Sequence, residues 1–455
     1  MNNFFYYLAA FALVLGILII VHEYGHYLVA RLCGVKVLRF SVGFGRPVWQ
    51  RQYGPDKTEW AIGLFPLGGY VKMLDEREAP VAPEELDRAF NRQTVWRRMA
   101  IVAAGPVFNF LLAILVYWGI FWHGTDELRP VLGAPPAATA AAAAGFEYGE
   151  RVLKVADEPV QTWEDVRWLL LQRAVNDSNV QLEVINERQE ISIRRLDLAG
   201  IRESGWEGDA FSRLGLTFYR PKLPPVIGRV VAGGVGESAG LKVGDRVEAI
   251  SGSEINHWSE VVAIIRESAG KPLSLEIIRD GKSLTLELQP ELHEERGHRF
   301  GRIGVAVSEA GLSRKDLTVR VSYGPVDALG KAVRETWEKS VFSLVMLGKM
   351  VTGEVSWRNL SGPVTIADYA GQSAKLGIEY YLKFLALVSI SLGVLNLLPI
   401  PILDGGHLMY YVVEIIKRGP VSERTMEIGQ QIGFALLMML MAFAFYNDIN
   451  RLISG

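Results

Sequence analysis

The sequence predicts an α-helical polytopic membrane protein with four transmembrane helices, a membrane-associated β-hairpin sheet and two inserted α+β domains. Three observations predict this fold class. The chain of 455 residues is 49% hydrophobic and 22% charged, and its apolar residues are gathered into a few long blocks. About 20 apolar residues are needed to cross a bilayer as a helix. One block carries a metal-binding motif, and a long polar stretch after the second block repeats its own pattern.

The first predicted span covers residues 1–33 and contains the pentapeptide HEYGH at its inner end. No charged residue precedes this motif. Helical spacing puts His22 and His26 on one face, one turn apart, where two imidazoles can bind a single Zn²⁺ while Glu23 acts on a water molecule. Ionisable side chains inside a membrane are costly and usually mark a site, which argues against a chance motif. The span is therefore predicted to carry a catalytic zinc.

A cleaved signal peptide is the alternative for this first segment. Such a peptide has basic residues near its start, whereas no Lys or Arg precedes Arg31. Cleavage would also remove the motif, so we expect a retained span. The only cysteine, Cys33, leaves no partner for an internal disulfide, and we expect it to pack as a small apolar residue rather than bind metal.

Residues 34–75 are rich in β-branched and aromatic residues and are interrupted by turn signals that contain glycine and proline. This pattern predicts a membrane-associated β-hairpin region directly after the metal motif. The edge of such a sheet could bind an extended substrate by strand addition. A purely structural sheet is the alternative.

Residues 76–98 are predicted to form a charged cytoplasmic loop, and residues 99–122 a second span. Lys and Arg are concentrated between the first two spans, and the positive-inside rule therefore places this loop in the cytoplasm and the following polar stretch outside. Asn109 lies in the middle of the second span. An intramembrane Asn usually bonds neighbouring helices, and a direct catalytic role is the alternative.

The polar stretch contains two copies of one domain, at residues 128–221 and 222–310. Matching segments share an offset of 95 residues: 130–133 with 225–228, and 149–152 with 244–247. Each copy is predicted to run as strand, Ala-rich turn, Gly-Asp/Glu turn, strand and amphipathic helix, which resembles the circularly permuted PDZ domain of bacteria. PDZ domains bind peptides by strand addition beside the helix. Peptide ligands are therefore expected, unless the copies serve only as bulky spacers.

Residues 322–350 show apolar side chains at helical spacing, but the uninterrupted apolar part is too short to cross a bilayer. The pattern predicts an interfacial amphipathic helix, with packing onto the soluble domains as the alternative. Residues 380–407 form the predicted third span, and residues 428–447 form a fourth span that returns the C-terminus to the outside.

The inner end of the third span reads NLLPIPILDGGH, from Asn396 to His407. Its two prolines break the helix, so the groups that are freed near membrane depth must line a cavity or a site. A catalytic zinc takes three protein ligands and keeps one position open. Asp404 is the expected third ligand, and His407 is the competing candidate.

These motifs together resemble the site-2 protease family along essentially the whole chain. The resemblance implies a zinc metalloprotease of the bacterial inner membrane that performs regulated intramembrane proteolysis, with its active site toward the cytoplasm. The PDZ domains would lie in the periplasm and act as a size filter. The implied substrates are single-span proteins, such as an anti-sigma factor already cut outside, and remnant signal peptides. The implied consequence is activation of the extracytoplasmic (sigma-E) stress response.

The same resemblance assigns roles to individual residues. His22, His26 and Asp404 would be the zinc ligands, and Glu23 the general base. Asn396 would hold the substrate backbone or the developing oxyanion. The strands would clamp an extended substrate through Gly43, Phe44, Gly45, Gly68, Gly69 and Tyr70.

Two other function classes remain open on the residues alone. A membrane adaptor could hold a structural zinc with four ligands, because His407 could join the other three. A transporter could use the polar intramembrane cluster, but the four spans lack the internal repeat that is common in transporters. The net charge of -2 offers no electrostatic footprint for nucleic acid.

Overall fold

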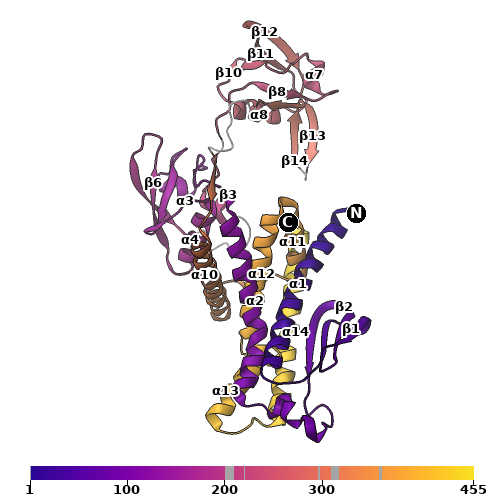
Figure 1. Cartoon of the computed structure of the whole chain (residues 1–455). Coiled ribbons are helices and arrows are strands. Elements are labelled where there is room, and N and C mark those ends of the chain that lie inside the picture. The colour runs from indigo at the N-terminus through magenta and orange to yellow at the C-terminus, as the bar shows by residue number, and fades with distance from the viewer. Residues whose placement is uncertain are drawn as a thin grey trace.

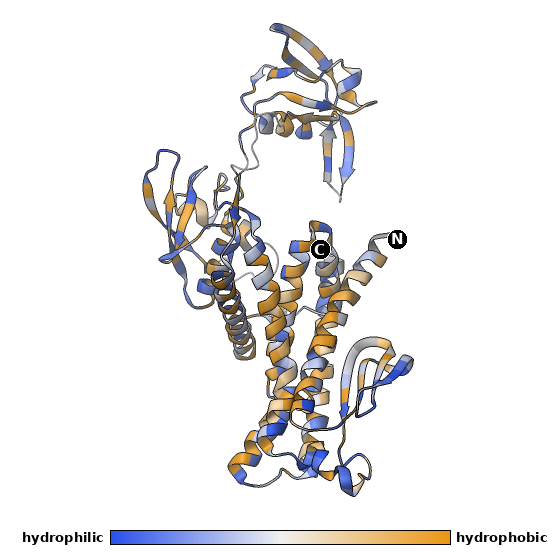
Figure 2. Ribbon diagram, viewed as in Figure 1, coloured by the Kyte–Doolittle hydropathy of each residue, from blue (hydrophilic) through white to orange (hydrophobic). Residues whose placement is uncertain are grey.

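A computed structural model of the protein describes residues 2–199, 210–219, 221–295, 298–308, 317–357 and 361–454. Four of its helices are long and apolar enough to cross a membrane. Figure 2 shows that apolar residues predominate along these helices, whereas apolar and hydrophilic residues are mixed in the two inserted domains. The predicted fold class is confirmed, and the chain is a multi-pass membrane protein. The four helices are α1 (Asn2–Leu32), α2 (Val95–His123), α12 (Ile378–Leu397) and α14 (Glu423–Ser454).

The β-hairpin region consists of two long strands, β1 (Val37–Tyr53) and β2 (Thr58–Met73), which lie beside α1 (Figure 1). Both strands bend, so that the first half of β1 pairs with two different parts of β2. Val42, for example, is paired both with Gly69 and with Ile62. The result is a small layered sheet packed against the helix that carries HEYGH. The charged loop that follows contains two short 3₁₀ helices, η1 (Pro83–Arg88) and η2 (Phe90–Arg92).

Two PDZ-like domains are inserted between α2 and the third long helix. The strand orders of their main sheets are equivalent, β5-β4-β6-β7 in the first and β10-β9-β11-β12 in the second. Each sheet packs with a helix around its own apolar core. Residues 296–297 and 309–310 of the expected second domain, and 200–209 and 220 of the first, lie outside the described residues. The elements of the first domain are α3 (Ala140–Ala143), β4 (Arg151–Val155), β5 (Glu158–Pro159), α4 (Trp163–Asn176), β6 (Asn179–Ile185), β7 (Ile191–Asp197) and α6 (Ala210–Leu214).

The second domain lies apart from the helix bundle in Figure 1, whereas the first lies against it. Its helices are α7 (Val235–Ser238) and α8 (Trp258–Glu267). Its strands are β8 (Ile227–Val230), β9 (Arg246–Ile250), β10 (Ser253–Glu254), β11 (Leu273–Arg279), β12 (Lys282–Leu288), β13 (Glu291–Glu295), β14 (His298–Arg302) and β15 (Val305–Val307). The insertion begins and ends at one place, because β3 (Thr125–Leu128) pairs with β16 (Thr318–Val321).

The amphipathic segment forms α10 (Pro325–Thr352), which packs along α2 and α12. It also contacts the first PDZ-like domain, where the Trp168 indole N–H donates to Glu338 at 3.2 Å. Part of its apolar face stays exposed, including Trp337 at 69%. The helix thus packs onto a soluble domain, as the alternative expectation had it, while its exposed apolar stripe suits a membrane interface.

The expected third span is not one helix. Helix α12 ends at Leu397, where Leu398 turns to an extended conformation, and α13 (Asp404–Lys417) begins at the aspartate. The prolines at 399 and 401 cannot donate backbone hydrogen bonds, which explains the interruption. One further helix, α11 (Pro363–Leu376), packs against α1, α12 and α14.

Candidate metal centre

Three side chains from two separate helices converge toward the C-terminal end of α1. His22 and His26 come from α1, and Asp404 is the first residue of α13. Their ligand atoms all lie within 4.8 Å of one another. His22 Nε2 is 3.2 Å and His26 Nε2 3.6 Å from Asp404 Oδ2, and the two Nε2 atoms are 3.2 Å apart.

This donor set fits a zinc ion. Ligand atoms that share one tetrahedral Zn²⁺ at about 2.0–2.2 Å must lie roughly 3.2–3.6 Å from each other, as these three do. Two imidazoles and one carboxylate are a typical catalytic set, which leaves a fourth position for water or substrate. His407 does not belong to this cluster of described residues. The geometry therefore favours Asp404 over His407 as the third ligand.

Helix α2 carries the groups that orient both histidine rings. His26 Nδ1 donates to the backbone carbonyl of Ile101 at 2.8 Å, and Asn109 Nδ2 lies 3.1 Å from His22 Nδ1. Such contacts fix the ring orientation of metal-binding histidines. Gly105 lets α2 come this close, because a methyl group there would lie 2.3 Å from His26 Nε2.

Helix α13 holds Asp404 in place through contacts at its other end. Arg98 Nη2, in the first turns of α2, donates to Glu414 Oε1 at 2.7 Å, and its guanidinium lies 4.9 Å from the centre of the Tyr411 ring. These contacts tie the inner end of α2 to the helix that begins with the ligand. The orientation of Asp404 thus depends on the same helix that orients the histidines.

The β1–β2 sheet places the expected substrate-binding residues beside Glu23. A methyl group at Gly69 would lie 2.8 Å from Glu23 Cγ and 2.9 Å from the carbonyl oxygen of Ser41. The Phe44 ring covers Gly68 and stacks on Tyr70, with ring centres 6.2 Å apart. Gly43 and Gly45, on either side of Phe44, have positive φ and turn the strand there.

Asn396 lies in the last turn of α12 and is partly buried. It stands before the proline-containing break that leads to Asp404. The structure therefore brings His22, His26 and Asp404 together and places Gly69 next to Glu23, while Asn396 lies at the end of α12, before the break that leads to Asp404.

Two residues were not expected at the site. Gly105 and Ile101 act through a close approach and a backbone carbonyl, neither of which leaves a side-chain signature in one sequence. The spacing of Gly105 and Asn109, one helical turn apart on α2, was the only available signal.

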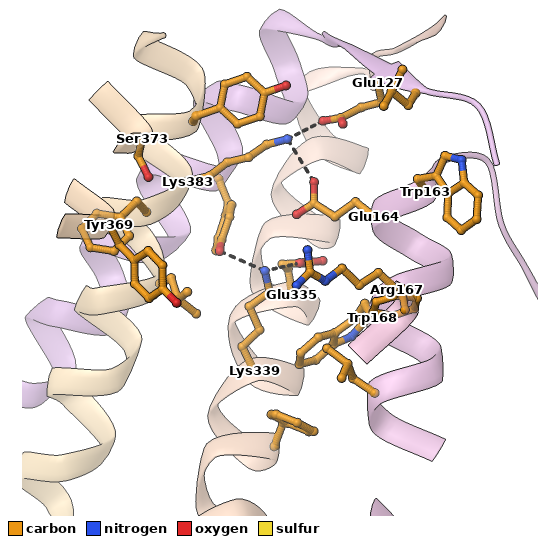
Figure 3. Close-up of a pocket in the computed structure, with 18 of the residues that line it drawn as sticks. Glu127, Trp163, Glu164, Arg167, Trp168, Glu335, Lys339, Tyr369, Ser373 and Lys383 are labelled. Carbon is orange, nitrogen blue, oxygen red and sulfur yellow. Dashed lines mark hydrogen bonds and ion pairs between the residues drawn. The ribbon is translucent and has the colours of Figure 1, made fainter. Parts of the chain in front are cut away.

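A cavity of about 1970 Å³ lies elsewhere, between the first PDZ-like domain and helices α10, α11 and α12. Figure 3 shows two lysines in it: Lys383 faces Glu127 and Glu164 from other elements, and Lys339 pairs with Glu335 one turn away on α10. Lys383 Nζ is 3.1 Å from Glu164 of the soluble domain and also pairs with Glu127. The metal ligands do not line this cavity.

Comparisons with known proteins agree with this site. The model of Peptidase family M50 matches residues 10–440. "Regulator of sigma-E protease RseP" of Salmonella typhimurium is 44% identical over 451 residues, which cover 98% of each chain. The protein of the same name from Escherichia coli is 42% identical over 458 residues, which cover 99% of this chain and 100% of the relative. A Ralstonia nicotianae protein whose name proposes a zinc metalloprotease is 44% identical over 460 residues, covering 97% of this chain and 98% of the relative. The chain belongs to peptidase family M50, as a zinc metalloprotease of the membrane.

Proposed function

We propose that this protease hydrolyses a peptide bond inside the membrane-spanning segment of its substrate, with zinc held by His22, His26 and Asp404. The observation that carries the proposal is the cluster itself. Its ligand atoms meet within 4.8 Å, and two of them belong to a helix that is apolar enough to cross a bilayer. A catalytic site in that position acts on bonds at membrane depth.

The chain's own residues would divide the chemistry as follows. Lewis acidity is what zinc supplies when bound, polarising the scissile carbonyl and making water easier to deprotonate. Glu23, next to the first ligand and on the same helix, would accept the proton of the attacking water. It would then return this proton to the leaving amine.

The sheet and the broken third span would present the substrate. A helical substrate hides its backbone groups in its own hydrogen bonds, so it must unwind before it is cut. The β1–β2 sheet reaches Glu23 at Gly69, and an extended substrate paired with it would lie beside the general base. Asn396 would offer an amide to the substrate backbone or to the developing oxyanion.

The substrates are proposed from the relatives and from the resemblance described above. Relatives over nearly the full length are named regulators of sigma-E protease. We therefore assign single-span membrane proteins as substrates, namely an anti-sigma factor after a first cut outside, and remnant signal peptides. Their cleavage would activate the extracytoplasmic stress response.

The proposed location is the bacterial inner membrane. The basic loop between the first two spans supports a cytoplasmic position for the metal centre and a periplasmic position for both PDZ-like domains. In the second domain, a groove of about 260 Å³ between α8 and β15 is lined by Trp258, Val261 and Val305. Its shape suits an added peptide strand. The tandem as a whole would act as a size filter.

The test is cleavage of a single-span protein by the full-length enzyme in detergent. Glu23→Gln should keep the zinc but lose at least 99% of the activity, because an amide cannot accept the proton. Glu84→Gln, in the exposed part of the loop, is the matched control and should cut like the wild type. Wild-type cleavage by Glu23→Gln would remove Glu23 from the mechanism.

A further inference from the structure

Asn109 connects three helices at the level of the metal centre. Its side chain is fully buried in α2. The amide Nδ2 lies 3.1 Å from His22 Nδ1 on α1, and the backbone carbonyl accepts from Ser389 Oγ on α12 at 2.7 Å. The bond to Ser389 joins helices without using the amide. The amide must therefore be explained separately.

One half of that amide has no hydrogen-bond partner. Asn109 Oδ1 is buried, and none of the described residues bonds to it. Buried polar atoms are nearly always paired, and an exception calls for an explanation. A residue kept only to hold helices together would not leave a buried acceptor unused.

The hydrogen bonds around the two histidines determine where their protons lie. His26 Nδ1 must carry a hydrogen, because it faces the carbonyl of Ile101, which can only accept. In the neutral ring its Nε2 then has a free lone pair. That lone pair is available to a metal, and His22 Nε2 lies 3.2 Å from the same nitrogen and from Asp404 Oδ2, the separation expected of atoms that share one zinc ion.

A metal-binding His22 needs the same kind of partner. An imidazole that ligates through Nε2 keeps its hydrogen on Nδ1, where it needs an acceptor. An asparagine amide carries a donor and an acceptor of nearly the same shape. A half-turn of the amide would place Oδ1, now without a partner, against His22 Nδ1–H.

We propose that Asn109 is a positioning residue for the metal, whose amide oxygen accepts from His22 Nδ1–H when zinc is bound. This inference rests on the proposed ligand set. His26 needs no such partner, because the Ile101 carbonyl already fixes it in the form that can bind metal. Asn109 would thus do for His22 what that carbonyl does for His26.

The test compares Asn109→Asp with Asn109→Leu in the full-length protein. Zinc affinity is measured by competition with a chelator, and the ligand field by the visible spectrum after Co²⁺ substitution. Leu fills the space but cannot accept a hydrogen bond from His22 Nδ1–H, so the zinc affinity of Asn109→Leu should fall about 10- to 100-fold. The Asp carboxylate can accept this hydrogen bond. The Asn109→Asp variant should therefore bind zinc close to the wild-type level and retain the wild-type Co²⁺ spectrum. Ser389→Ala is the control for helix contact and should leave the zinc affinity unchanged.

A role in packing alone predicts the opposite order. A buried carboxylate would then disturb the bundle most, and Leu would be tolerated. Zinc affinity that is kept in Asn109→Leu and lost in Asn109→Asp would therefore overturn the inference. If the wild type itself bound no zinc, the proposed metal site would fall instead, so the two failures are distinguishable.

Discussion

At the scale of single residues, the metal site is built from three ligands and the small set of groups that aim them. His26 is fixed by a backbone carbonyl and His22 by an amide, and both partners belong to α2. Asp404 is fixed by the start of α13. Outer contacts of this kind raise metal affinity because they remove the freedom of the rings to turn away.

Gly105 offers the sharpest residue-scale prediction. In Gly105→Ala the new methyl group would lie 2.3 Å from His26 Nε2 and 2.7 Å from His22 Cε1, so the rings must move. We expect zinc affinity to fall about 10- to 100-fold, measured by chelator competition. Gly119→Ala is the control on the same helix, because nothing lies within 4 Å of its Cβ. Equal zinc affinity in the two variants would contradict the close approach of α2.

The ligands were predictable from the sequence, whereas the groups that orient them were not. His22 and His26 follow from helical spacing, and Asp404 follows from the carboxylate behind a helix break near membrane depth. The partners on α2 depend on how that helix is rotated toward α1. The long apolar parts of these two helices carry little periodicity that would fix this rotation. Asn109 was accordingly expected to bond helices, with catalysis as the alternative.

At the scale of elements, the two PDZ-like domains share one internal anchor. Glu150 and Asp245 occupy equivalent positions, and each is buried next to an arginine. Arg194 Nη2 lies 2.6 Å from Glu150 Oε1, and Arg279 Nη2 lies 2.7 Å from Asp245 Oδ2. Each carboxylate also accepts a backbone N–H from three residues earlier. The repeat in the sequence thus preserves a buried ion pair, although the arginines come from different strands.

Asp245→Asn should destabilise the second PDZ-like domain by about 2 kcal/mol, because the arginine loses its charged partner. Hydrogen exchange of the core strand β11 in the full-length protein measures this change. The corresponding strand of the first domain, β6, serves as the internal control and should exchange as in the wild type. Faster exchange in both domains, or in neither, would contradict independent cores.

The ion pair between Asp245 and Arg279 makes the stability of the second PDZ-like domain depend on pH. Burial alone would raise the pKa of the Asp245 carboxyl, but Arg279 and the Lys242 N–H outweigh it and lower the pKa below its ordinary value of 3.8. The ion pair therefore stabilises the domain fully above that value and loses its effect as the pH falls through the lowered pKa. We expect the stability gap between wild type and Asp245→Asn to be constant near neutral pH and to close below about pH 4, measured by thermal unfolding. A gap that widens in acid would contradict the sign of the pKa shift.

The element boundaries were partly predictable for physical reasons. The prolines at 399 and 401 predict the break after α12, because proline disrupts a continuing helix. The bending of β1, which pairs twice with β2, was not predictable, because register depends on contacts across the sheet rather than on local pattern.

At the scale of the whole molecule, the two PDZ-like domains differ in attachment although their sequences repeat. The first is docked on the bundle through Lys383, whose side chain is only 16% exposed and which pairs with Glu127, Glu164 and Glu379. Lys349 Nζ adds a bond to the carbonyl of Val175 at 2.5 Å. In Figure 1 the second domain lies apart from the helix bundle. Self-similarity reveals a duplication, but it does not reveal which copy binds to the rest of the chain.

Lys383→Met should loosen the first domain. Three carboxylates would lose their shared cation, and the free energy that holds α4 against the helix bundle should fall by about 2 kcal/mol. Hydrogen exchange at this contact should therefore accelerate roughly thirtyfold, while the second domain stays unchanged. Lys282→Met, on the exposed surface of the second domain, is the control. Unchanged exchange in α4 and α10 would show that the ion pairs do not hold the domain.

The most direct test of the central claim is to locate the bond that the enzyme cuts. The full-length protease is incubated in lipid with a single-span substrate, and the products are identified by mass spectrometry. A metal centre near the inner end of α1 predicts a cut inside the apolar span of the substrate, in the half nearer the cytoplasm, and no products with Glu23→Gln. Cleavage confined to the polar flanks of the substrate would contradict proteolysis within the membrane.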